Sequence, residues 1–324
     1  MRKSGIFCAA LLLASAAFAA EASAKSTLRL GTVLAPNDPL FLAALQMKKD
    51  VEARTKGNVE VQVFPSSQLG DTQNMMDQAH AGANVGTFVE SSRVSPFVPE
   101  FNVLVAPYAF KDVFEIAKFV ETPTFAEWNE QLKKKTGLTL LSYNWYQGAR
   151  HMLTKKPVNA PADLKGVRIR TIGEPLWVKT IAAMGAVPTP LAWAEVYPSI
   201  QTGVIDGAEA QPSAIRGAKL YEVVSHITLT EHIFLMSGLI VSDKWLQSLP
   251  ADDRKIVMEE AKKAGAMALK TNVDQADEIF KEIAAKGVKV SKIDTTPFRN
   301  AVQPVYAELG LTSMVAQVRK AIGQ

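Results

Sequence analysis

Two arginines in the middle of the chain carry the clearest sign of chemistry. Arg168 and Arg170 stand two positions apart within residues 167–171, which read as a β-strand, so their side chains point to the same face of that strand. A guanidinium offers two parallel donors that fit a carboxylate, which the ammonium group of a lysine cannot match. The pattern therefore suits the binding of an anionic small molecule, although a charged surface strand fits it as well.

Patterns typical of enzymes and metal proteins are missing from the sequence. The four histidines do not fall into a metal-ligand spacing, and no H-E-x-x-H, G-x-S-x-G, P-loop or G-x-G-x-x-G pattern occurs. Asp206 and Glu209 are close enough in sequence to share a cation, but a turn after a strand explains this run better. We therefore expect no catalytic residue, no metal and no cofactor. The four histidines, which we expect to be structural, are His80, His151, His226 and His232.

Short strand-like runs alternate with helical ones along the chain. Residues 27–32, 59–64, 85–89, 138–143 and 167–171 read as strands, and residues 73–81 and 175–184 read as helices, with further helices in 113–135. Another helix is predicted to begin at Asp38, with Pro39 at its first position, and to end at Gly57. This alternation indicates an α/β fold.

One helix is predicted to be unusually long. From Pro250 to Ala285 the helical pattern meets only Gly265, and Gly287 ends it. At 1.5 Å per residue such a helix is roughly 50 Å long, more than the width of a small domain. It is therefore expected to bridge two lobes, the alternative being two helices with a kink near Gly265.

The N-terminus reads as a signal peptide, residues 1–24. Arg2 and Lys3 precede an apolar run over residues 6–20, and Ala22-Ser23-Ala24 suits cleavage before Lys25. Cleavage after Ala19 and a retained anchor are the alternatives. The single cysteine, Cys8, would leave with the signal, so no disulfide is expected in the mature chain. We expect a soluble protein in the periplasm without membrane insertion.

Composition narrows the class of partner. The formal net charge is +4, from 36 Lys and Arg against 32 Asp and Glu, and the two signs are interleaved. Nucleic-acid binding therefore has no support, whereas a small anionic ligand is compatible with this balance. About 300 residues remain after the signal, which is enough for two domains.

The central part of the chain resembles a known family. Residues 162–171, 185–197 and 200–209 are similar to the solute-binding subunits of tripartite ATP-independent periplasmic (TRAP) transporters, of the C4-dicarboxylate-binding (DctP) type. Residues 64–71, 90–93 and 219–223 extend the resemblance over essentially the whole mature chain. The resemblance implies a periplasmic protein that captures a small carboxylate and delivers it to the membrane subunits of a transporter, and we expect a monomer. A soluble receptor for a sensor kinase and a periplasmic enzyme are the alternatives.

The resemblance also implies roles for individual residues. Arg170 matches the arginine that grips the ligand carboxylate, whereas Arg168 is expected at the strand's start in solvent. Arg150 matches a second positive group near the ligand. Glu90 and Arg93 match a Glu-x-x-Arg pattern of sialic-acid-binding relatives. Trp193 stands where an aromatic residue covers the ligand, the alternative being a core aromatic.

Departures from the sialic-acid binders bear on the ligand. Val33, Thr72 and Ala210 replace polar partners of sugar hydroxyls, and a buried unpaired hydroxyl costs about 1–3 kcal/mol, so sialic acid is disfavoured.

Gln211 is expected to restore one polar contact. Phe88 is expected near the ligand, together with Trp145 and Tyr146. The sequence thus favours a smaller or more apolar acid (hydroxy, oxo or aromatic). A dicarboxylate or uronic acid stays open, because Arg93 and Arg150 would accept a second polar end.

The family's architecture implies two lobes that close around the ligand. The first lobe is expected to hold residues 25–147 and 236–275, and the second lobe residues 148–235 and 276–324.

Overall fold

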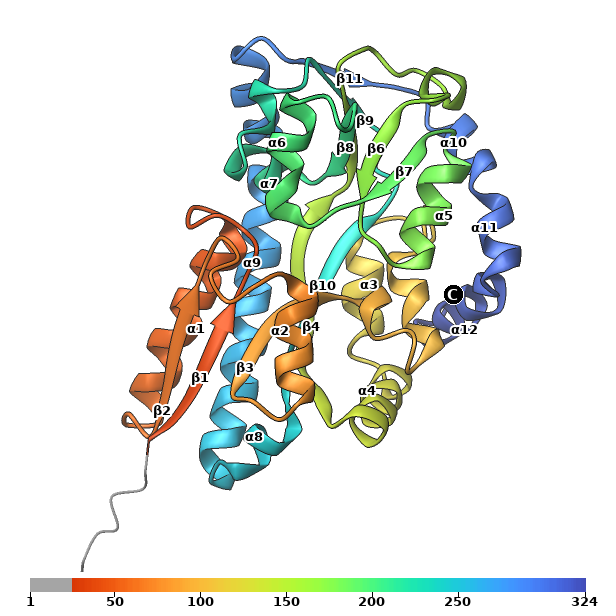
Figure 1. Cartoon of the computed structure of the whole chain (residues 1–324). Coiled ribbons are helices and arrows are strands. Elements are labelled where there is room, and N and C mark those ends of the chain that lie inside the picture. Colours follow the sequence, from red (N-terminus) through yellow and green to blue (C-terminus); the bar gives the residue numbers. More distant parts are fainter. Residues whose placement is uncertain (1–24) are drawn as a thin grey trace, which may run out of the picture.

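The computed structural model describes residues 25–324, which form two β-sheets flanked by helices (Figure 1). The predicted signal peptide, residues 1–24, lies outside the described residues. Within residues 25–324, no helix combines the length and the hydropathy needed to cross a bilayer.

The first sheet has five strands and a mixed topology. β1 pairs in parallel with β2 and β3, whereas β10 runs antiparallel to both β3 and β4. Its strands, in spatial order, are β2 (Val59–Phe64), β1 (Ser26–Gly31), β3 (Val85–Glu90), β10 (Phe234–Ser242) and β4 (Leu138–Ala149).

The second sheet has six strands. β6 pairs in parallel with β7 and β8, and β5 runs antiparallel to β8 and β9. Its strands, in spatial order, are β11 (Lys289–Lys292), β9 (His226–Leu229), β5 (His151–Thr154), β8 (Gly207–Ala210), β6 (Arg168–Thr171) and β7 (Val187–Pro190). The predicted two-lobed α/β fold is confirmed.

Helices cover both sheets, and the α2 and α3 helices begin at side-chain caps. Asp71 accepts a hydrogen bond from Asn74 N at the start of α2, and Asp112 caps α3. Around the first sheet lie α1 (Pro39–Arg54), α2 (Thr72–His80), α3 (Val113–Phe119), α4 (Pro123–Thr136) and α8 (Asp243–Ser248); the second sheet carries α5 (Pro175–Ala183), α6 (Val196–Gln201), α7 (Pro212–Gly217) and α10 (Thr296–Ala301).

Two strand connections and one helix join the two sheets. β4 leads into β5 through Arg150 alone, and β9 returns to β10 through residues 230–233. The two connections are hydrogen-bonded to each other, since Arg150 N donates to Ile233 O at 2.8 Å and His232 N to Arg150 O at 3.3 Å. In Figure 1, β4 and β10 pass side by side from one half of the molecule to the other.

The third connection is α9 (Ala251–Ala285), one continuous helix of 35 residues. Its first half packs Val257 and Ala264 into the core beside the first sheet, and its second half packs Ile279 and Ile283 into the core of the second. Gly265 does not break the helix. It lets the helix approach β4, because a β-carbon there would overlap the Asn144 carboxamide. The bridging helix is therefore confirmed as one continuous helix, and not as the two helices that were its alternative.

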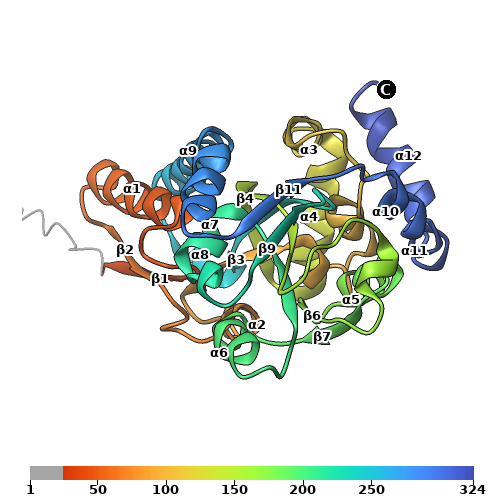
Figure 2. The same ribbon diagram turned by 90° about the horizontal axis from the view of Figure 1, so that it is seen from above.

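The C-terminal helix α11 (Gln303–Glu308) lies beside α5 (Figure 2), and α12 (Leu311–Ala321) continues to the first half of the molecule, where it contacts the 3-10 helix η2 (Pro99–Val105). Val305, Leu311 and Val318 belong to the same buried cluster as Phe101 and Phe119. The lobe boundaries expected from the sequence stay a proposal. They place α11 and α12 in the second lobe, although residues of both helices pack in a buried cluster with residues of the first lobe.

Candidate functional site

A cavity of about 420 Å³ lies where the two halves of the molecule meet. This volume is within the range of small-molecule binding sites. The first half supplies Val33, Leu34, Asp71, Thr72, Gln73, Glu90 and Arg93, and the second half and the crossing strands supply Gln147, Arg150, Arg170, Ile172, Gly173, Glu174, Pro190, Leu191, Ala192, Trp193, Gln211, Ala214 and Leu235.

Arg170 is a buried cation on one wall of the cavity. It is 5% exposed, its Nε donates to Leu191 O at 3.0 Å, and its guanidinium lies 5.4 Å from the Trp193 ring. No carboxylate lies within ion-pair distance of it among residues 25–324. Burial lowers the pKa of Arg170 to about 10. A desolvated guanidinium without an acid beside it is suited to bind an anion from solution.

Of Arg168 and Arg170, only Arg170 lines the cavity, because Arg168 lies two residues earlier, at the start of the strand. It is the first residue of β6, its side chain is 44% exposed, and it pairs with Asp206 at 2.8 Å. As predicted, Arg168 stands in solvent at the strand's start, while Arg170 lies near the carboxyl end, where parallel strands open onto ligand clefts.

Arg150 also lines the cavity, but each of its three guanidinium nitrogens already donates a hydrogen bond within the protein. Its Nε pairs with the Glu209 carboxylate, Nη2 donates to Glu209 O at 2.6 Å, and Nη1 donates to Gln211 Oε1 at 2.6 Å. Trp177 stacks at 5.2 Å from the guanidinium. The positive charge of Arg150 is therefore balanced within the protein, and its main effect on the cavity is to position Gln211.

Glu209 is fully buried between two basic side chains. Burial raises its pKa, but Arg150 and His232 outweigh this effect and lower the pKa to about 2. His232 Nε2 lies 3.6 Å from Glu209 Oε2, and burial lowers the pKa of His232. Asp206 and Glu209 thus serve separate ion pairs, and no group of residues that could hold a metal ion occurs in residues 25–324.

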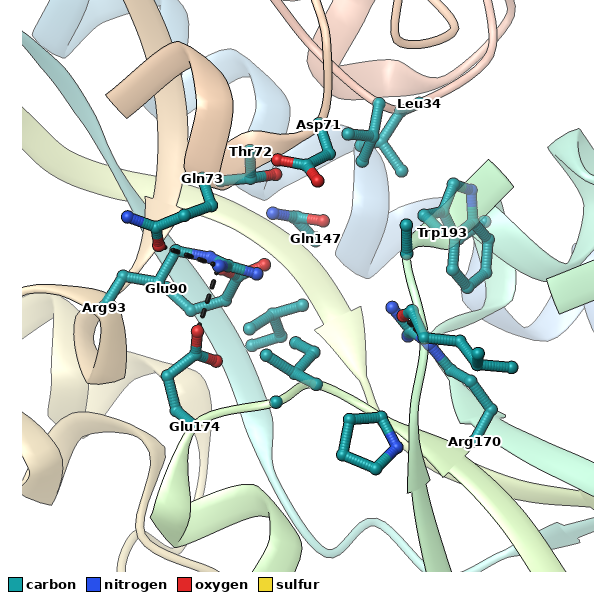
Figure 3. Close-up of a pocket in the computed structure, with 18 of the residues that line it drawn as sticks. Leu34, Asp71, Thr72, Gln73, Glu90, Arg93, Gln147, Arg170, Glu174 and Trp193 are labelled. Atoms are coloured by element: carbon teal, nitrogen blue, oxygen red, sulfur yellow. Dashed lines mark hydrogen bonds and ion pairs between the residues drawn. The ribbon is translucent and has the colours of Figure 1, made fainter. Parts of the chain in front are cut away.

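Arg93 links the two halves of the molecule across the cavity. It lies in the short 3-10 helix η1 (Ser91–Arg93) after β3, and its Nε donates to Glu90 at 2.7 Å. Its Nη1 lies 2.9 Å from Glu174 Oε1, at the start of α5, and 3.4 Å from Gln73 Oε1 (Figure 3). Burial raises the pKa of Glu174, and its second oxygen, Oε2, is buried and has no hydrogen-bond partner within residues 25–324.

Trp193 begins the short 3-10 helix η4 (Trp193–Glu195) at the wall beside Arg170 (Figure 3). It packs against the buried clusters of both halves and lines the cavity. Its position is compatible with both roles considered for it, and the role as a cover over the ligand stays a prediction.

Seven of the nine residues singled out from the sequence line this cavity, and Phe88 and Ala210 do not. Phe88 lies two residues before Glu90 on β3, about 6–7 Å further from the strand's end. Its ring packs against the ring of Trp145, with 4.7 Å between the ring centroids. Ala210 is buried in the core of the second sheet. Trp145 and Tyr146 do not line the cavity either, so the cavity gives no support to the expectation that these four residues lie near the ligand, which stays a prediction.

Sequence reasoning missed four polar side chains that line the cavity, Asp71, Gln73, Gln147 and Glu174. Gln147 stands between the walls in Figure 3, where its Oε1 accepts from Gln211 at 2.9 Å and its Nε2 donates to Ser237 at 2.5 Å. Glu174 lies three residues after the end of β6. The available signal was its position, a charged residue after the carboxyl end of a parallel strand and just before a helix.

Comparison with known proteins identifies the family. The profile described as bacterial extracellular solute-binding protein, family 7 (DctP), matches residues 30–312. A sialic acid-binding periplasmic protein of Vibrio cholerae is 29% identical over 299 residues, 92% of each chain.

Two solved structures are similar over nearly all of the described chain. A TRAP periplasmic solute-binding protein of Escherichia fergusonii, in an apo open structure, is 47% identical, with a TM-score of 0.80 over 91% of this chain and 99% of that one. One from Actinobacillus succinogenes with bound L-galactonate is 27% identical, with a TM-score of 0.88 over 92% and 99%. The chain belongs to the DctP family of TRAP transporter solute-binding proteins.

Proposed function

We propose that this protein captures a small organic acid in the cavity, with Arg170 as the anchor for its carboxylate, and delivers it to the membrane subunits of a TRAP transporter. The observation that carries the assignment is the buried guanidinium of Arg170 with no carboxylate partner in residues 25–324. A cation taken out of water gains most from an anion that forms both parallel hydrogen bonds. L-Galactonate, the ligand of the Actinobacillus relative, is such an anion.

The proposal includes a closed arrangement of the two lobes. The described chain superposes better on the L-galactonate-bound relative, with a TM-score of 0.88, than on the apo open relative, with 0.80, although the latter is nearly twice as identical in sequence. Two contacts between the two halves of the molecule support the same arrangement: Arg93 with Glu174, and Trp177 Nε1 with Ser92 Oγ at 2.9 Å.

We further propose that the protein acts in the periplasm as a monomer, after removal of the signal peptide, and binds its ligand without a cofactor and without chemical conversion. The family consists of solute-binding proteins, which supports this part of the proposal. The charged groups of the site also favour binding: Arg150, Glu209, Arg93 and Glu90 are engaged with one another in pairs rather than poised for proton transfer.

A thermal-shift screen with small carboxylates, each paired with its own carboxamide, tests the proposal. A ligand at 100 times its Kd stabilises the folded protein by about 2.7 kcal/mol, which is readily detected. We expect stabilisation by at least one acid and none by its amide, because the amide lacks the charge that Arg170 binds. Stabilisation by acid and amide alike would contradict the anchor.

Closure gives a second expected result. Binding of the acid found in the screen should reduce the radius of gyration in solution scattering and change the tryptophan fluorescence, since Trp193 lies beside Arg170. A ligand favours the closed form only through contacts that are better there than in the open form. Trp193→Ala should remove much of the optical change but leave part of the compaction. An unchanged scattering profile at saturating ligand would show that the pocket is preformed.

A further inference from the structure

The two walls of the cavity differ in their balance of charge. On one wall, Arg170 stands without an acid beside it. On the opposite wall the single cation, Arg93, is flanked by the carboxylates of Glu90 and Glu174, with Asp71 nearby (Figure 3). A ligand anchored at Arg170 therefore extends toward a wall with more negative than positive charge.

We propose that Glu174 sets the class of ligand: the acid carries one carboxylate, bound at Arg170, and its far end presents hydrogen-bond donors such as hydroxyl groups. A second carboxylate at that end is rejected. This inference rests on the function proposed above and names the ligand class of the same site.

Neither of the other two arginines is free to take a second carboxylate. Arg93 already meets two acids, at 2.7 Å and 2.9 Å. Arg150 is paired with the buried Glu209 and holds Gln211. A second anion would thus have to displace an internal carboxylate or lie against it, and like charges repel strongly in a poorly hydrated site.

Glu174 has the acceptor that a hydroxylated ligand needs. Its Oε1 lies 2.9 Å from Arg93, so the carboxylate is fixed in place, and its side chain, which is 15% exposed, lines the cavity. A carboxylate can accept several hydrogen bonds, so the exposed part of this group is still able to accept one from a ligand. A hydroxyl group of the ligand has a proton to donate to it, whereas a ligand carboxylate has none.

The position of Glu174 explains how it can discriminate between ligands. It immediately precedes Pro175, the first residue of α5, and follows the strand that carries Arg170 by three residues. The anchor and the discriminating acid are thus fixed to the same sheet, while Glu90 and Arg93 come from the other half of the molecule. The length of ligand between them is therefore set largely within one lobe.

Calorimetry with matched pairs of acids tests the inference. The probes are four- to six-carbon aldonates (monocarboxylates) and the aldarates of the same configuration, in which the terminal CH₂OH is a second carboxylate. The wild-type protein should bind at least one aldonate about 30-fold or more tightly than its aldarate. Glu174→Gln should lower this ratio at least tenfold, chiefly through tighter binding of the aldarate, because the repelling charge is gone.

The control is Glu278→Gln, on the exposed face of α9 with a side chain 67% exposed, which should leave the ratio unchanged. If Glu174→Gln does not fold, Glu90→Gln carries the same prediction, since it removes the other acid beside Arg93. Equal binding of an aldonate and its aldarate by the wild type, or a ratio unchanged in the variant, overturns the role of Glu174. If no acid of either class binds, the proposed carboxylate-binding function itself fails, which is a separate outcome.

Discussion

Arg170→Ala should weaken binding of the cognate acid by about 2–5 kcal/mol, the usual cost of removing one partner of a desolvated charge pair. At 1.4 kcal/mol per tenfold change, this is roughly 30-fold to several thousand-fold in Kd. The effect is expected to be large because the guanidinium is buried and has no acid of the protein beside it within residues 25–324. The ligand carboxylate is thus its principal source of charge compensation. Isothermal titration calorimetry measures the change.

Two further variants separate the anchor from a general effect of charge. Arg170→Lys keeps the charge but should also bind poorly, since one ammonium cannot reproduce two parallel hydrogen bonds. Arg168→Ala removes an arginine from the same strand, where it is exposed and paired with Asp206, and should leave Kd almost unchanged. A change below about threefold for either Arg170 variant would contradict the assignment.

The positions of elements could be predicted from the sequence because they depend on local patterns. The strand around Arg170 and the helix after Asp38 have their own periodicity and caps, and the structure places them within a few residues of the prediction. The length of α9 followed in the same way from a helical pattern that only Gly265 interrupts.

The electrostatic state of the site could not be predicted, because its ion pairs join residues that are remote in the chain. Arg150 meets Glu209, 59 positions later, and Arg93 meets Glu174 in the other half of the molecule. Sequence reasoning therefore treated both arginines as available for the ligand, and only the folded arrangement shows that Arg170 alone of the three cavity arginines lacks an acid partner within residues 25–324.

The sequence also did not show how far along its strand a residue must lie to reach the cavity. Phe88 and Glu90 lie on one strand with the same alternation, yet only Glu90, at the strand's end, reaches the cavity. Likewise Ala210 ends β8 in the core and the next residue, Gln211, turns into the site. Period-two patterns identify the face of a sheet but not where the ligand lies along it.

Glu209→Gln should lower the free energy of unfolding by about 3–5 kcal/mol, because it leaves the buried charge of Arg150 without its counter-ion. The carboxylate and the guanidinium are both almost fully buried. Urea unfolding at neutral pH measures the loss. The control is Asp206→Asn, three residues earlier, whose pair with Arg168 is exposed and should be worth less than about 1 kcal/mol.

The same pair makes stability depend on pH in a defined direction. The pKa of Glu209 is lowered to about 2 in the folded protein, against about 4.3 for an unperturbed glutamate. The unfolded chain therefore binds the proton first, so the stabilisation is complete above the unfolded pKa and is lost as the pH falls toward 2. Between about pH 5 and pH 3 the difference in unfolding free energy between wild type and Glu209→Gln should shrink steadily, while above about pH 5 it should stay nearly constant. A difference that stays constant also below about pH 5, or a variant as stable as wild type at pH 7, would show that Glu209 does not compensate Arg150. Binding should fall together with stability, since Arg150 also holds Gln211 at the cavity wall.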